Sequence, residues 1–111
     1  MNSILTSIKK LLGISEEYED FDKEIIMHIN SAFSVLTQLG VGPVCGFVIT
    51  DSNTEWSAFL SDNHRLEFVK NYVYLKVKLG FDPPTNSAAI EAINRQISEL
   101  EWRIIVAIET V

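Results

Sequence analysis

Three residues with side chains suited to nucleophilic catalysis follow one another in the middle of the chain: Cys45, Asp51 and His64. A thiol, an imidazole and a carboxylate can act together as nucleophile, general base and orienting group. The surroundings of Cys45 argue against this chemistry, because the thiol lies in an apolar stretch with no neighbouring cation to favour the thiolate. We therefore expect no enzyme. A small enzyme that depends on Cys45 or His64 is the catalytic alternative.

The sequence also argues against a metal ion or a cofactor. His28 has no second histidine or carboxylate four residues further on, as a zinc site on a helix would need. The acidic loop 16–22 lacks the alternating oxygen positions and the central glycine of a calcium loop. Residues 40–42 open no helix that could hold a phosphate, because Pro43 follows them. We expect none of these ligands.

Composition limits the remaining classes of protein. The 111 residues are 47% hydrophobic and 22% charged, which is typical of one folded domain that spans residues 1–111. A single cysteine excludes an internal disulfide. Nine basic and fifteen acidic residues give a net charge of −6, which argues against tight binding of nucleic acid phosphates. The longest apolar run, residues 104–108, is too short to cross a membrane. We expect a soluble protein in the cytoplasm.

The elements that position these side chains are predicted to be helices. Apolar residues recur at helical spacing over 2–12, 23–39, 64–79 and 87–109, with one or two further turns at 54–60. Asp22 is expected to be the N-cap of the second helix. Val44–Thr50 is predicted to be extended, although one strand makes no sheet. The expected fold class is all-α, a small helical domain of about four helices with a short extended segment around residues 44–50.

The helical stripes predict both a core and a second apolar surface. The predicted core consists of Ile29, Phe33, Leu36, Val69, Tyr72, Val73, Ile93, Ile97 and Leu100. The last helix also carries apolar residues away from this stripe, which is typical of a helix with a second partner. Together with the extended segment they form a hypothetical oligomer interface of Trp102, Ile105, Val106, Val44, Phe47 and Ile49.

The order of these features resembles a known family. A helix that starts near residue 21 ends in LGVG at 39–42, and Trp56 and Phe59 follow it. Next come an aromatic and lysine-rich helix, the LGFDPP break at 79–84 and a last helix with ELEWR at 99–103. From about residue 10 to 105 the chain resembles the small head–tail connector, or neck adaptor, proteins of tailed bacteriophages and prophages.

This resemblance implies a structural protein without catalysis. It implies a homo-oligomeric ring on the portal protein, through which DNA passes without specific binding, and contact with a downstream neck or tail-completion protein. The expected place is the virion neck, and the host cytoplasm before assembly. The alternative is a small helical binding or regulatory module, such as a phage-encoded inhibitor of a host protein, which would be monomeric or dimeric.

Overall fold

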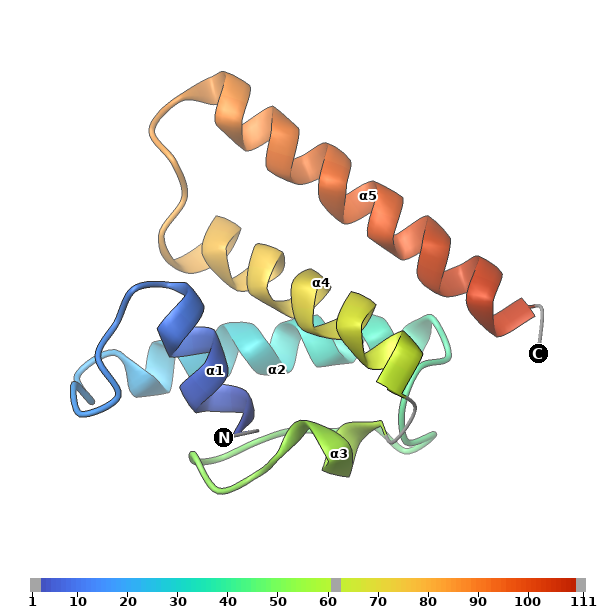
Figure 1. The fold of residues 1–111 in the computed structure, drawn as a ribbon, viewed down its shortest axis with the longest axis horizontal. Helices are drawn as coiled ribbons and strands as arrows, with labels where there is room; N and C mark the ends of the chain where they lie inside the picture. The colour runs from blue at the N-terminus through green and yellow to red at the C-terminus, as the bar shows by residue number, and fades with distance from the viewer. Residues whose placement is uncertain (1–2, 61–62, 110–111) are drawn as a thin grey trace.

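Five helices, close to the expected ranges, make up most of the fold. The computed structural model describes residues 3–60 and 63–109, and at residues 63–65 and 107–109 it describes the helical backbone only. The helices are α1 (Ile4–Leu11), α2 (Asp22–Gln38), α3 (Trp56–Phe59), α4 (Asn63–Phe81) and α5 (Ser87–Glu109) (Figure 1). No strand occurs within the described ranges, where Ser3 and Glu55 form an isolated bridge. The prediction of an all-α domain is therefore confirmed.

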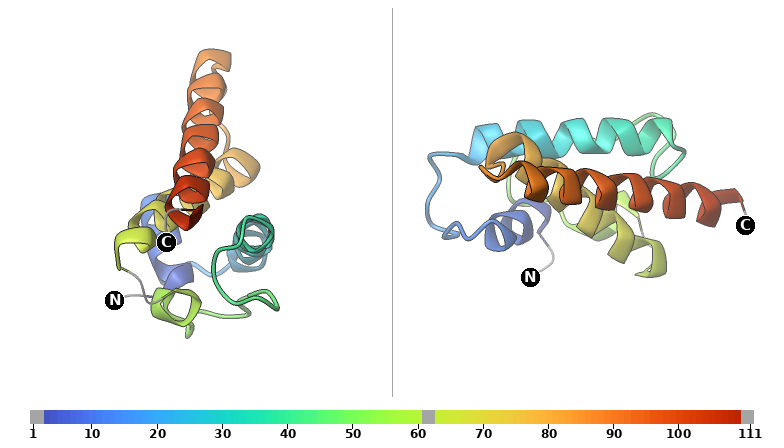
Figure 2. Two further views of the ribbon diagram at one scale, coloured as in Figure 1. Left: turned by 90° about the vertical axis from the view of Figure 1, so that its right-hand side faces the viewer. Right: turned by 90° about the horizontal axis from the view of Figure 1, so that it is seen from above.

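Helix α4 lies at the centre of the fold. It packs against α2 on one side and against α5 on another, while α1 packs against α2. Figure 2 shows α5 extending away from the layer that holds α2, and the whole molecule measures 40 × 36 × 21 Å. Because α4 has neighbours on two sides, Val73, Leu75 and Val77 are all buried. Their strand-like alternation in the sequence reflects this two-sided burial of a helix.

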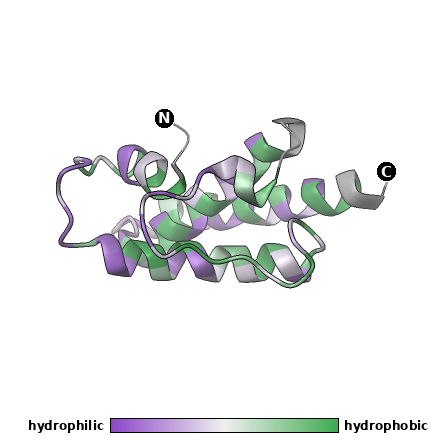
Figure 3. Cartoon of the chain, turned by 90° about the horizontal axis from the view of Figure 1, so that it is seen from below, coloured by the Kyte–Doolittle hydropathy of each residue, from purple (hydrophilic) through white to green (hydrophobic). Residues whose placement is uncertain are grey.

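The core follows the predicted stripes closely. All of the predicted core residues are buried except Ile93, which is half-buried because α5 is covered on one side only. Along the helices, hydrophobic and hydrophilic positions alternate as amphipathic helices require (Figure 3). The packing of these stripes is what fixes the direction of each helix.

An aromatic cluster joins α2 to the segments that precede α4. The ring of Phe33 lies 4.5 Å from Phe59, 5.1 Å from Phe47 and 6.2 Å from Trp56, measured between centroids. Gly42 has a φ angle of +82°, and any Cβ at this position would overlap the Phe59 ring. Only glycine combines that backbone conformation with such a close approach.

The start of α2 differs from the prediction. Phe21 occupies the N-cap position and Asp22 is the first helical residue. The carboxylate of Asp22 does not cap the helix, because its Oδ1 atom lies 2.8 Å from the ammonium group of Lys9. Lys9 is only 2% exposed and also donates hydrogen bonds to the carbonyl oxygens of Glu16 (3.1 Å) and Tyr18 (2.7 Å). A buried lysine therefore fixes the acidic loop, the hydrophilic segment at the left of Figure 3.

The LGFDPP break joins α4 and α5 into a helical hairpin. After Pro83 and Pro84, the side-chain oxygen of Asn86 accepts a hydrogen bond from the Ala88 amide at 2.7 Å and caps α5. Near the end of α4, Lys78 and Asp82 form an ion pair of 3.0 Å. Helix α5 packs alongside α4 after this break (Figure 1).

Candidate functional site

An exposed apolar surface lies on the side of α5 that does not pack against the core. Trp102 is 64% exposed, and Ile105 and Val106 are each 37% exposed. These three residues are spaced i, i+3 and i+4, so they form one continuous patch on the helix surface. Ile97, Leu100 and Ile104 occupy the side that packs against the core. We call the Trp102, Ile105 and Val106 surface the α5 patch.

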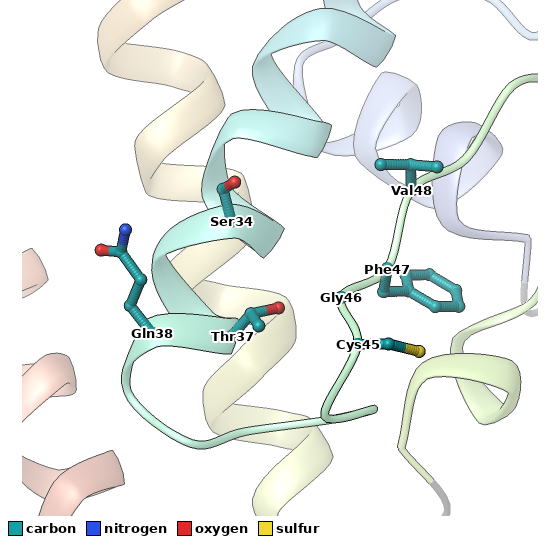
Figure 4. Close-up of a pocket in the computed structure, with 7 residues that line it drawn as sticks. All are labelled: Ser34, Thr37, Gln38, Cys45, Gly46, Phe47 and Val48. Carbon is teal, nitrogen blue, oxygen red and sulfur yellow. The ribbon is translucent and has the colours of Figure 1, made fainter.

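A second surface is a groove between α2 and the segment that follows it. The groove has a volume of about 440 Å³ and is lined by Ser34, Thr37, Gln38, Cys45, Gly46, Phe47 and Val48. Figure 4 shows residues 45–48 running beside the C-terminal half of α2, with Thr37 directed toward them. Val44 is fully exposed and Val48 is 67% exposed at its edge. We call this feature the α2 groove.

The segment predicted to be extended forms one wall of the α2 groove and is no strand. Residues 44 and 45 form a turn and residues 46–50 follow an irregular path. Asn30 fixes this path, because its side-chain oxygen accepts from the Ile49 amide (2.8 Å) and its amide nitrogen donates to the Ile49 carbonyl (3.0 Å). Nothing in the sequence pattern singled out Asn30, apart from its being a polar residue beside an apolar stripe.

The structure divides the six residues of the hypothetical interface into three groups by exposure. The three α5 residues and Val44 are exposed, as an interface with another molecule requires. Phe47 is half-buried between the groove and the aromatic cluster. Ile49 is only 1% exposed, so we leave it out of the proposed contact surface. Its side chain belongs to the core because Asn30 holds its backbone against α2.

A buried hydrogen bond connects α5 to α4. The hydroxyl group of Tyr72, which is fully buried, donates to a carboxylate oxygen of Glu101 at 2.8 Å. Burial and then the nearby carboxylate raise the pKa of Tyr72 well above its ordinary value of 10.0. The bond sits one residue before Trp102, so it helps to hold the α5 patch in a fixed orientation.

Tyr72→Phe is expected to reduce the free energy of unfolding by about 1.5 kcal/mol at pH 7, because a hydrogen bond to a charged acceptor is lost. This difference should shrink above about pH 10. Above that pH the tyrosine loses its proton in the unfolded chain, whereas folded Tyr72 keeps its proton because its pKa is raised. Loss of the proton favours the unfolded wild-type chain. The phenylalanine variant has no such proton, so its stability does not change through this group. Urea unfolding of both proteins from pH 7 to 11 measures the effect. A difference that stays constant with pH would contradict this role of Tyr72.

Of the three candidate catalytic residues, the structure describes the side chains of Cys45 and Asp51. Cys45 is exposed at the α2 groove, and the Asp51 carboxylate accepts from the Asn53 amide in a local turn at 2.9 Å. The side chain of His64 lies outside the described residues. His28 packs edge-on against Phe81, with 6.5 Å between ring centroids. Among the residues described, no three histidine, cysteine or carboxylate side chains are grouped to hold a metal ion.

None of the described helices combines the length and the apolar character needed to cross a membrane.

Two surface features stand out on this small helical domain, an apolar patch on α5 and a neutral groove beside α2. An exposed apolar patch of this kind is typical of proteins that bind other proteins.

Comparison with known families identifies the particular family. Residues 4–111 match the family described as phage connector protein, so the chain belongs to that family. No curated protein and no solved structure matched the chain. The family membership confirms the resemblance to phage connectors and gives the chain a connector-type structural role, in association with other head or tail proteins of a phage particle.

Proposed function

We propose that this protein assembles into a closed ring on the phage portal and forms part of the neck through which DNA passes. In this proposal the ring also contacts the downstream neck or tail-completion protein. The protein reaches the neck from the host cytoplasm, where it is made.

The observation that carries the proposal is the α5 patch in a member of the connector family. A tryptophan that is 64% exposed beside two aliphatic residues is costly to keep in water unless another molecule covers it. Each of these side chains contributes about 1.5–3 kcal/mol when fully buried, before the costs of association. A repeated contact of this kind between identical chains can close a ring when its rotation divides a full turn.

Net charge is compatible with a passage for DNA. The chain carries −6 at pH 7, and few basic side chains are available to hold phosphates. Every lysine or arginine that contacts a phosphate strengthens binding and would slow the movement of DNA. A ring that only lets DNA pass therefore requires no side chains that recognise DNA bases.

Native mass measurement tests this function. The protein is measured alone and together with the portal protein of the same phage, over a range of concentrations. We expect one closed oligomer, formed at high concentration or on the portal, because the single contact is small. A protein that stays monomeric or dimeric under both conditions would favour the alternative of a small regulatory module.

A further inference from the structure

We propose that the α2 groove is the receptor for the α5 patch of the next copy in the ring, with Trp102 as the side chain that enters it. This proposal rests on the ring described above and names the two surfaces that meet. The occupant of the groove is thus a second copy of this chain.

The two surfaces belong to different elements, the α5 patch to the last helix and the α2 groove to α2 and residues 45–48. Helix α4 packs against both α2 and α5, and Figure 2 shows the N-terminal half of α5 extending away from the α2 layer. Trp102 is turned away from the side of α5 that packs on α4, and Ser34 is turned away from the buried stripe of α2. A contact between two different surfaces of one molecule is heterologous, which is the type that builds rings.

The absence of charge distinguishes this groove from three other grooves on the described part of the chain. Its lining residues are all neutral. The groove between α4 and α5 contains Glu99 and Arg103, the one between α2 and α4 contains Lys76, and the one on the N-terminal half of α2 contains Lys23. An apolar patch placed on any of these three would remove a charged group from water, which is unfavourable.

The groove also offers the chemistry that a buried indole requires. Phe47 lines the groove and its ring packs against Phe33 and Phe59, and a buried indole N–H needs a hydrogen-bond acceptor. Thr37 donates its own hydroxyl hydrogen to the Phe33 carbonyl at 3.0 Å, so its oxygen remains able to accept. The side-chain amide of Gln38 supplies a second acceptor at the same wall. An aliphatic side chain such as that of Ile105 or Val106 would use neither acceptor.

Site-directed cross-linking tests this pairing, because Cys45 is the single native cysteine and is exposed at the groove. The variant Ser98→Cys places a thiol on α5 one turn before Trp102 and keeps Trp102 itself. We expect a short bis-maleimide to link residue 98 of one copy to Cys45 of the next. The products should form a ladder larger than the dimer, and mass spectrometry of linked peptides identifies the joined residues.

Three control variants and one disruptive variant, Ser34→Glu, make the result specific. Ser98→Cys combined with Cys45→Ala should give no ladder, and Leu11→Cys, at an exposed position on α1, should give no link to Cys45. Adding Ser34→Glu to the Ser98→Cys chain should reduce the link to Cys45 at least tenfold. Adding Ser31→Glu instead, on the same helix but outside the groove, should leave the link unchanged.

The outcomes separate the pairing from the ring itself. A closed oligomer whose links join only residue 98 to residue 98, or that shows no link to Cys45, would overturn the pairing and leave the ring intact. A chain that forms no oligomer, alone or on the portal, would overturn both.

Discussion

Trp102→Glu together with Val106→Glu is expected to abolish assembly onto the portal and the production of infectious particles. The two substitutions replace the centre of the α5 patch with two negative charges. The variant loses about 1.5–3 kcal/mol of burial for each side chain and must also remove two carboxylates from water. Since every contact in a ring is repeated, the loss at each subunit adds up around the whole assembly.

Native mass and particle yield measure this effect, and the fold of the isolated protein should be retained because both residues are exposed. The matched control is Leu11→Glu with Asn94→Glu, which adds the same two charges at exposed positions outside the α5 patch. The control should assemble normally. Normal assembly of the Trp102 and Val106 variant would show that α5 is no part of the interface.

Lys9→Met is expected to reduce the free energy of unfolding by about 3 kcal/mol, as removal of one partner of a buried ion pair does. Methionine fills the space of the lysine stem, but it leaves the Asp22 carboxylate and the Glu16 and Tyr18 carbonyl oxygens without their donor. We place the effect at the lower end of the usual range because the Asp22 side chain keeps 25% of its exposure. Against a typical stability of about 5–15 kcal/mol, this is a large loss.

Lys10→Met is the matched control, since Lys10 is the exposed neighbour on the same helix. Its effect should stay within about 0.5 kcal/mol. Urea unfolding of the two variants compares them directly, and hydrogen exchange of residues 16–22 should increase in the Lys9 variant alone. Equal stability of the two variants would mean that the buried ammonium group contributes nothing to the fold.

The helices and most of the core could be predicted because their causes are local. Apolar spacing marks α2 and α5, glycine and proline mark their ends, and Asn86 provides a cap that the sequence displays directly. The α5 patch was also predictable, since Trp102, Ile105 and Val106 lie off the stripe of Ile97 and Leu100. Apolar residues on two sides of one helix indicate a second partner from spacing alone.

The differences from these predictions all involve partners that are distant in sequence or lie outside the local pattern. Asp22 was expected to cap α2, but the return of the chain at residues 16–22 brings its carboxylate to the buried ammonium group of Lys9. Ile49 was placed at the interface because the extended segment had no known neighbour. Asn30, nineteen residues earlier, holds it against α2 instead.

The sequence by itself determined the helical class, the positions of the helices, the family resemblance and the apolar edge of α5, because each depends on spacing within one segment. Only the tertiary structure decided what lies opposite that edge. The α2 groove exists because Asn30 and the aromatic cluster around Phe33 hold residues 45–48 beside α2. Such a surface is made by side chains from separate segments, and its shape and lack of charge appear only when packing brings them together.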